Sequence, residues 1–324
     1  MAEQTKKLLE VKNLTIHYET EDGLVKALND ANIDIGVGET LGLVGETGAG
    51  KTTLAKGIMG LIPKPPGRII SGQIIYEEQD LLQLGTEAMR TIRGGHISMI
   101  FQDPMTSLNP VLTVGEQILE VILQHNKLSS AEARVMAEGM LERVGIPAGR
   151  FGEYPHQFSG GMKQRVVIAI ALACNPRLLI ADEPTTALDV TIQAQVLDMI
   201  HKLKAENNTS MILITHDLGV VAQNCDKVAI IYAGEIIEYG SLREIYKNTR
   251  HPYALGLFGS IPSLTSEVRR LQAIDGMMPD PTNLPDGCKF AERCRRAQAD
   301  CSKTNPEMRT ISKDHSVRCF HYEE

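Results

Sequence analysis

Residues 40–52 read Thr-Leu-Gly-Leu-Val-Gly-Glu-Thr-Gly-Ala-Gly-Lys-Thr. The first part, Thr40–Val44, is an apolar run of the kind that forms a buried strand. The rest, Gly45–Thr52, fits the pattern G-x-x-x-x-G-K-S/T in full, and helix-forming residues follow from Lys51. A strand, a glycine-rich loop and a helix in this order predict a loop that binds phosphate groups.

The residue types in this loop suit phosphate binding. Glycines let backbone N–H groups curl around phosphate oxygens, and the N-terminus of the following helix favours negative charge. Lys51 would bridge the terminal phosphates of a nucleotide, and Thr52 would offer its hydroxyl to Mg²⁺. The alternative is a glycine-rich turn that happens to precede a lysine. We expect a nucleotide site made of Gly45, Glu46, Thr47, Gly48, Ala49, Gly50, Lys51, Thr52 and Thr53.

A second stretch, Leu178–Glu183, supplies two acidic side chains. Its apolar part reads as a short buried strand, so Asp182 would lie at the carboxyl edge of the sheet, beside the phosphate loop, and hold Mg²⁺. Strand side chains alternate, so Glu183 need not share that task. We predict that Glu183 is the general base that polarises the attacking water. Without a phosphate loop, exposed acidic residues after a strand would be the simpler interpretation.

Strand and helix patterns alternate along much of the chain. Alternating apolar residues near the N-terminus flank a turn at Glu21-Asp22-Gly23, and helical patterns dominate between Gln102 and Ser159. Expected strands lie within 8–44 and at 69–76, 178–181 and 211–214, and expected helices begin at Lys51 and span 114–124, 130–144 and 191–207. This order predicts an α/β fold with a parallel sheet.

Composition excludes several classes of protein. The 33 Lys and Arg against 40 Asp and Glu give a net charge of −7, which argues against a nucleic-acid partner. The longest apolar run, Val166–Cys174, is far shorter than the roughly 20 residues that cross a bilayer. The N-terminus lacks the apolar stretch of a signal peptide. We expect a cytosolic protein that other chains hold wherever it works at a membrane.

The stretch Phe158–Arg165 reads Phe-Ser-Gly-Gly-Met-Lys-Gln-Arg and opens a long apolar helix. It resembles the signature motif of ATP-binding-cassette (ABC) ATPases. In that family Ser159, Gly160 and Gly161 would contact the γ-phosphate of a nucleotide held by the other subunit, so the resemblance implies a head-to-tail dimer. Met162 stands where many members carry glutamine, so we assign it no nucleotide role. Ser159 also suits a helix N-cap, and both roles can hold together.

Other motifs of that family follow in the family's order. The resemblance implies that Gln102 senses Mg²⁺ and water, that Ala187-Leu188-Asp189 communicates across the dimer, that His216 lies near the γ-phosphate, and that Tyr18 stacks on adenine. Each is weak alone, because a lone glutamine or histidine is more often an ordinary loop residue. The resemblance covers roughly residues 8–250. It gives Glu183, His216 and Gln102 as catalytic residues and Thr52, Gln102 and Asp182 as ligands of Mg²⁺.

Four further stretches are similar to one branch of the family, the ATPases of oligopeptide, dipeptide and nickel importers. They are Met89–Gly94, Gln102–Pro110, Ala187–Gln195 and His251–Tyr253. The resemblance is closest to the first, D-type ATPase subunit of that branch. It implies a second, different ATPase subunit, two transmembrane permeases and an extracytoplasmic substrate-binding protein, with this chain on the cytoplasmic face of the cell membrane. Peptide cargo rests on this resemblance, and nickel chelates or oligosaccharides stay open.

The resemblance implies an ABC-type ATPase core at 8–258, with an antiparallel β portion at its start and a helical portion at about 103–175. A small cysteine-rich extension follows at 259–324. A soluble ABC ATPase of DNA repair or translation is the rival class. Repair members carry a long insertion between the two halves of the site, for which this chain has no room. Translation members carry two cassettes, whereas this chain has one phosphate loop.

The extension holds four of the six cysteines. Cys288, Cys294, Cys301 and Cys319 are spaced C-x5-C, C-x6-C and C-x17-C, and in a reducing cytosol their clustering favours a metal over disulfides. Four thiolates suit zinc or an iron–sulfur cluster, and the resemblance favours a structural [4Fe–4S] cluster. The cationic residues around Cys294 are expected to lower the thiol pKa values. A redox-sensing regulator is a third interpretation, in which ATPase activity would follow oxidation state.

Overall fold

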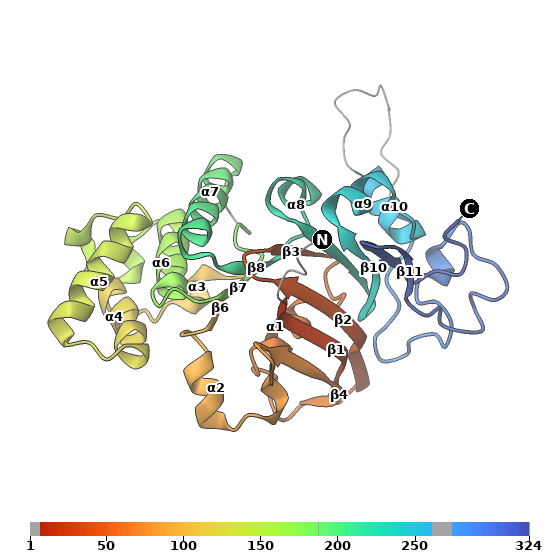
Figure 1. Ribbon diagram of the computed structural model, residues 1–324, viewed down its shortest axis with the longest axis horizontal. Helices are drawn as coiled ribbons and strands as arrows, with labels where there is room; N and C mark the ends of the chain where they lie inside the picture. The colour runs from red at the N-terminus through yellow and green to blue at the C-terminus, as the bar shows by residue number, and fades with distance from the viewer. Residues whose placement is uncertain (1–6, 187, 261–273, 324) are drawn as a thin grey trace. The chain divides into compact units, whose positions relative to one another are not determined.

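The computed structural model describes residues 7–186, 188–260 and 274–323 (Figure 1). Ala187 of the predicted dimer loop and residues 261–273 of the predicted extension therefore lie outside the described residues. The chain forms two compact units. The first contains Gly36–Glu39 and Gln83–Ile214, and the second contains Lys7–Ile35, Thr40–Leu82 and the chain from Thr215 onward.

An antiparallel sheet begins the second unit. Its strands are β1 (Lys7–Thr20), β2 (Gly23–Gly36), β4 (Gly67–Tyr76) and β5 (Gln79–Asp80), in the order β2-β1-β4-β5 (Figure 1). The turn between β1 and β2 falls at the expected place, and Gly23 has a φ of 126°, which only glycine adopts without strain. Leu14 and Ile16 of β1 are fully buried, as their alternation predicts. The predicted antiparallel β portion is confirmed.

A second sheet of the same unit carries the predicted phosphate loop. β3 (Thr40–Val44) pairs in parallel with β9 (Lys227–Tyr232), which turns through Ala233 and Gly234 into β10 (Glu235–Ser241). β12 (His315–Val317) and β11 (Arg309–Ser312) extend this sheet from the far end of the chain. Of these strands β3 was predicted from the sequence, whereas β9, β10, β11 and β12 were not. The helices of this unit are α1 (Lys51–Ile58), α8 (Leu218–Asn224), α9 (Leu242–Lys247), α10 (Pro252–Gly259) and the short 3₁₀ turn η4 (Ala291–Arg293).

The first unit contains the strands predicted at 178–181 and 211–214, a further strand at 97–100 that was not predicted, and most of the helices. β8 (Ser210–Ile214), β7 (Leu178–Asp182) and β6 (Ile97–Ile100) lie in that order, and β7 pairs in parallel with both neighbours. The helices are α2 (Thr86–Ile92), α3 (Pro104–Ser107), α4 (Val114–His125), α5 (Ser130–Arg143), α6 (Gly160–Leu172) and α7 (Val190–Asn207). Two 3₁₀ turns, at Ala148–Arg150 and Pro155–Gln157, lie between α5 and α6. Another 3₁₀ turn, Leu81–Gln83, leads from the second unit into the first. No helix in the described part of the chain is both long and apolar enough to cross a membrane.

Local sequence explains where the helices of the helical portion begin. Thr113 caps α4 and Ser129 caps α5, and each forms a reciprocal capping box with a glutamate three residues later. The buried residues of α4 recur at helical spacing, as Val114, Ile118 and Ile122 do. The helices predicted at 114–124 and 130–144 are therefore confirmed. The domain boundaries near 103, 175 and 258 stay a prediction.

Two glycines of this portion give a matched test of packing. A Cβ built on Gly115 of α4 would lie 2.3 Å from the ring of Phe151, whereas one on Gly139 of α5 would meet nothing within 4 Å. Gly115→Ala should lower the free energy of unfolding by about 1–3 kcal/mol, because the ring must move. Gly139→Ala should raise it by up to about 1 kcal/mol through helix propensity. Urea unfolding of both variants measures this, and equal stabilities would contradict the packing described.

Candidate functional site

The predicted phosphate loop follows β3 directly and needs glycine at several positions. A Cβ on Gly45 would lie 2.3 Å from the backbone oxygen of Ile231, and one on Gly50 would lie 2.6 Å from that of Ala27. Gly50 also has a φ of 107° and stands at the N-cap of α1. The loop backbone is therefore packed from both sides in a conformation that side chains would disturb.

Lys51 opens α1 and is 6% exposed. Its Nζ donates hydrogen bonds to the backbone oxygens of Gly45 at 2.8 Å and Glu46 at 3.0 Å, so the ammonium lies against the loop itself. Thr52 and Thr53 follow in the first turn and are half-buried, while Thr47 and Gly48 are exposed. The first N–H groups of a helix lack intrahelical partners, and together with this ammonium they suit an anion.

The second unit also holds Tyr18 and His216. Tyr18 lies on β1 opposite Gly67 and is half-buried, with its ring 2.9 Å from the Cβ position of that glycine. His216 is exposed and follows Thr215, whose N–H donates to the backbone oxygen of Leu43 at 3.4 Å. His216 is therefore one residue from a contact with the strand that leads into the phosphate loop.

The acidic half of the predicted site lies in the first unit, at the end of β7. Asp182 is 2% exposed and pairs in register with Ile214 of β8. Glu183 leaves the strand with a φ of 47°, a left-handed conformation that costs a non-glycine residue of order 1 kcal/mol or more. Its N–H donates to the backbone oxygen of Ile214 at 2.9 Å, which fixes this turn.

Two side chains hold the Glu183 carboxylate. Oε2 accepts a hydrogen bond from Nε2 of Gln102 at 3.1 Å and another from Oγ1 of Thr186 at 2.9 Å. The fold thus brings together Gln102 and Glu183, which were predicted separately. Our sequence analysis missed Thr186. The signal available was a hydroxyl three residues after the acid, at the spacing of a tight turn.

The predicted signature motif begins α6, where the Ser159 hydroxyl caps the helix and accepts from the N–H of Met162 at 3.4 Å. Ser159 and Gly160 are exposed. A Cβ on Gly161 would lie 3.1 Å from Ile192, in the first turn of α7. Asp189 caps α7 by accepting from the N–H of Ile192 at 2.9 Å. The two loops predicted to act across a dimer thus begin neighbouring helices.

The four cysteines of the tail meet at one cavity of the second unit. Cys288, Cys294, Cys301 and Cys319 line it together with Phe290 and His251. The N–H of Cys288 donates to the backbone oxygen of Cys301 at 2.7 Å, so the segment 288–294 is tied to the segment around 301. The sequence cluster is therefore also a cluster in space.

The expected lowering of the thiol pKa values is wrong. Burial raises the pKa of Cys288 to about 11, and it also raises the pKa values of Cys294 and Cys319. Two of the nearby cationic side chains bind other groups than the thiols. Arg293 donates to the Glu46 carboxylate, and Lys289 donates to the backbone oxygens of Pro285 and Gly287. Arg296 opposes the rise in pKa at Cys294, and a backbone hydrogen bond from His321 together with Arg296 opposes it at Cys319, but burial outweighs these contacts at both thiols. Thiolates here need a bound cation.

One closer set of metal-ligating atoms exists among the residues that the structure describes. Atoms of Asp300, Cys301 and His321 lie within 4.8 Å of one another, and His321 Nε2 is 3.0 Å from the Asp300 carboxylate. Among the four tail cysteines, all of them described, no three have sulfur atoms that lie within 4.8 Å of one another. Their sulfur atoms are therefore spread around the cavity rather than gathered at one point.

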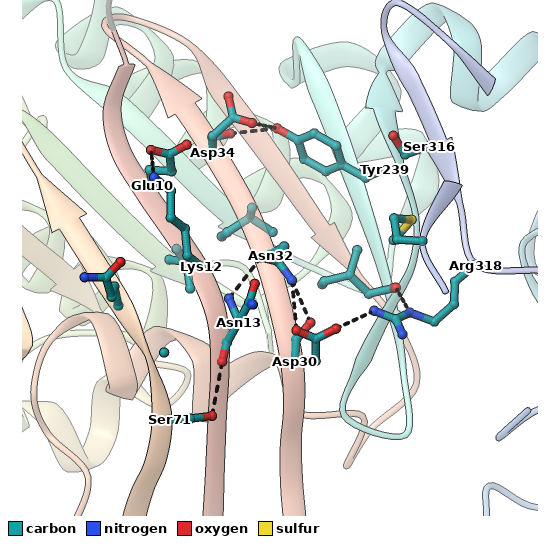
Figure 2. Close-up of a pocket in the computed structure, with 16 residues that line it drawn as sticks. Glu10, Lys12, Asn13, Asp30, Asn32, Asp34, Ser71, Tyr239, Ser316 and Arg318 are labelled. Atoms are coloured by element: carbon teal, nitrogen blue, oxygen red, sulfur yellow. Dashed lines mark hydrogen bonds and ion pairs between the residues drawn. The ribbon is translucent and has the colours of Figure 1, made fainter. Parts of the chain in front are cut away.

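A larger cavity of about 860 Å³ in the second unit contains none of the predicted site residues. It lies among β1, β2, β4 and the strands β10 and β12 (Figure 2). Its charged groups are paired: Arg318 with Asp30 at 3.1 Å, Lys12 with Glu10 at 2.9 Å, and Asp34 with Lys227 at 3.3 Å. In Figure 2, Arg318 reaches Asp30 of β2 and Tyr239 of β10 reaches Asp34 of β2, so these two contacts link the antiparallel sheet to the C-terminal part of the unit, whereas Glu10 and Lys12 both lie on β1.

Comparison with protein families gives two matches. A profile described as "ABC transporter" matches residues 28–186, and a profile described as "Oligopeptide/dipeptide transporter, C-terminal region" matches residues 237–301. The second match begins in β10 and includes three of the four tail cysteines.

Curated relatives match nearly the whole chain. The dipeptide transport ATP-binding protein DppD of Bacillus subtilis is 48% identical over 316 residues, which cover 97% of this chain and 94% of that protein. The oligopeptide transport ATP-binding protein OppD of Salmonella typhimurium is 48% identical over 315 residues, with coverage of 97% and 93%.

Solved structures match about three quarters of the chain. The ATP-binding cassette MJ0796, solved as a dimer in a post-hydrolysis state bound to ADP and Pi, has a TM-score of 0.66 and 28% identity, and covers 72% of this chain and 99% of its own. The protein cbiO1 of Clostridium perfringens, part of the ABC transporter complex cbiONQ, has a TM-score of 0.64 and 28% identity, with coverage of 75% and 92%.

Proposed function

The chain belongs to the ATP-hydrolysing subunits of ABC transporters, in their oligopeptide/dipeptide branch, and from this premise we propose that it drives the import of di- and oligopeptides. The carboxylate of Glu183 carries the proposal. It lies at the end of a buried strand, one residue after the buried Asp182, and is held by Gln102 and Thr186. A base fixed in this way beside a magnesium ligand suits water activation.

Each half of the site has its own task. The loop Gly45–Thr53 surrounds the phosphates with backbone N–H groups, Lys51 presents its ammonium to the β- and γ-phosphates from its place against the loop carbonyls, and Tyr18 stacks on adenine. The oxygens of Thr52, Asp182 and Gln102 are of the type that Mg²⁺ prefers, and they would hold it. Mg²⁺, when bound, neutralises charge that develops on the phosphates.

Hydrolysis needs a group that accepts a proton from the attacking water and a group that stabilises the charge on the γ-phosphate. Glu183 accepts a proton from the attacking water, while the hydrogen bonds from Gln102 and Thr186 keep its carboxylate oriented. His216 contacts the γ-phosphate and stabilises the charge that forms there. The left-handed backbone at Glu183 comes directly after Asp182, at the end of the buried strand.

Turnover requires a second ATPase subunit. Ser159, Gly160 and Gly161 stand at the N-terminus of a long helix, with the serine and the first glycine exposed, which suits a γ-phosphate held by the other subunit. Asp189 begins the neighbouring helix and would report across the same interface. We take the partner to be a different ATPase chain. Two permeases and an extracytoplasmic binding protein complete the importer, with this chain on the cytoplasmic face of the membrane.

Uptake by the assembled importer tests the function. The complex with its partner chains, reconstituted in vesicles, should accumulate a labelled tripeptide only when ATP and the binding protein are present. Nickel chelates and oligosaccharides are offered as rival cargoes in the same assay. Uptake of either in place of peptide would reassign the cargo and leave the ATPase role intact.

We assign the four tail cysteines as ligands of a structural [4Fe–4S] cluster, with zinc as the alternative metal. All four sulfurs line one cavity, yet no three of them lie within 4.8 Å of one another. Four sulfurs around one zinc, at about 2.3 Å from it, would lie about 3.8 Å apart. A cluster separates its ligands more widely, because four iron atoms lie between them. The spread of the thiols therefore favours the cluster.

Metal analysis of the chain purified without oxygen tests this assignment. We expect a brown protein with about four irons and matching sulfide per chain. Cys294→Ser should lose most of that iron, whereas Cys174→Ser, outside the tail, should keep it. His321→Ala should also keep it, because the set of Asp300, Cys301 and His321 belongs to the alternative site. A colourless protein with one zinc that His321→Ala removes would overturn the cluster.

A further inference from the structure

One residue of the phosphate loop is held by the cysteine-bearing tail and by α10. The N–H of Glu46 donates to the hydroxyl of Tyr253 at 3.0 Å, and its carboxylate accepts from Nη1 of Arg293 at 3.0 Å. Tyr253 is fully buried, and the Glu46 side chain is 31% exposed. Both polar ends of Glu46 are thus fixed by residues more than 200 positions away in the sequence.

Arg293 is built into this position. Its side chain is only 7% exposed, and its Nε donates to the backbone oxygen of Asp275 at 2.9 Å. Nη1 also donates to the hydroxyl of Tyr232 at 3.1 Å. A buried guanidinium needs a carboxylate partner, and Glu46 supplies it. The Arg293 guanidinium therefore contacts the phosphate loop rather than solvent.

The same part of the tail lines the cysteine cavity. Arg293 precedes Cys294, and Phe290 of this segment packs edge-on against Tyr232 at 5.3 Å and against Tyr253 at 5.5 Å between ring centroids. The side chain of Met278 also approaches the loop, and its methyl carbon lies 3.4 Å from the Cβ position of Gly48. Residues of the tail therefore pack against the phosphate loop at Glu46 and Gly48.

Glu46 passes this restraint to Lys51, because the Glu46 backbone oxygen accepts a hydrogen bond from the Lys51 ammonium at 3.0 Å. We propose that Arg293 is a positioning residue for the phosphate loop: by holding the Glu46 carboxylate, it sets the peptide that orients Lys51, so nucleotide affinity depends on the tail. This inference rests on the proposed function, in which the loop binds ATP.

Nucleotide affinity of the purified full-length chain tests the proposal, with methylanthraniloyl-ATP and Mg²⁺ as the probe. Arg293→Met keeps the aliphatic stem and removes every donor, and Glu46→Ala removes the acceptor. Each should weaken binding about tenfold, the effect of losing one charge-assisted hydrogen bond. The double variant should bind about as weakly as each single one, because both changes remove the same contact.

Arg295→Gln is the matched control, since Arg295 pairs with Asp275 at the surface and should leave affinity unchanged. Metal content and thermal stability are measured for every variant. If Arg293→Met loses its metal or its fold, Glu46→Ala decides, because it leaves the tail sequence untouched. Wild-type affinity in Glu46→Ala overturns the proposal, as does additivity in the double variant. A wild-type chain that fails to bind the probe would instead contradict the proposed function.

Discussion

Glu183→Gln should abolish steady-state ATP hydrolysis by the assembled transporter and leave ATP binding intact. The amide oxygen of glutamine can still accept from Gln102 Nε2 and Thr186 Oγ1, so the geometry of the site is preserved. Glutamine cannot accept a proton from water, and loss of a general base costs about 10²–10⁴-fold in rate. Phosphate release from the purified complex measures the rate, and methylanthraniloyl-ATP measures binding.

Glu142→Gln is the control for this prediction, because Glu142 is an exposed residue of α5 and the change removes the same charge from the same unit. It should hydrolyse ATP at the wild-type rate. Undiminished hydrolysis by Glu183→Gln would remove Glu183 from the role of base. Loss of binding in that variant would show instead that its carboxylate supports the nucleotide site as a whole.

The phosphate loop could be predicted in full because its backbone conformation and close packing require particular residue types at positions close together in the sequence. Gly45 and Gly50 face backbone oxygens within 2.6 Å of a Cβ position, so no other residue fits, and Lys51 must open the helix that follows. The strand that ends at Asp182 was equally predictable, because the apolar run Leu178–Ala181 that precedes this carboxylate is typical of a buried parallel strand. These features depend on neighbours in the sequence.

The missed features depend on distant partners or leave only a weak local signal. Thr186 donates to the Glu183 carboxylate across a tight turn in which Glu183 has a left-handed φ, and the hydroxyl three residues after the acid is a weak signal for that turn. The short strand β12 pairs with β10, in a register from Gly240 with His315 to Glu238 with Val317, so its partner residues precede it by 75–79 positions, and the largely exposed β11 pairs with β12 rather than with β10. The thiol pKa values were misjudged because Arg293, a sequence neighbour of Cys294, turns to Glu46 instead.

Lys51→Ala should remove most ATP binding by the purified chain, the largest loss of affinity expected from one substitution. The buried ammonium, now held by the Gly45 and Glu46 oxygens at 2.8 and 3.0 Å, is the one charged group placed inside the loop to meet phosphate. Two charge-assisted hydrogen bonds at about 1.5–3 kcal/mol each predict a loss of roughly hundredfold or more. Titration with methylanthraniloyl-ATP measures it.

Lys56→Ala supplies the control, because Lys56 lies in the last turn of the same helix and its loss changes the net charge equally. If Lys51 acted only through the overall field, both variants would weaken binding alike, which would contradict a direct phosphate contact. The size of the effect must also exceed the tenfold loss expected for Arg293→Met, since Arg293 acts on phosphate only through Glu46 and Lys51. An Arg293 effect as large as that of Lys51 would mean that the tail holds the whole loop in place.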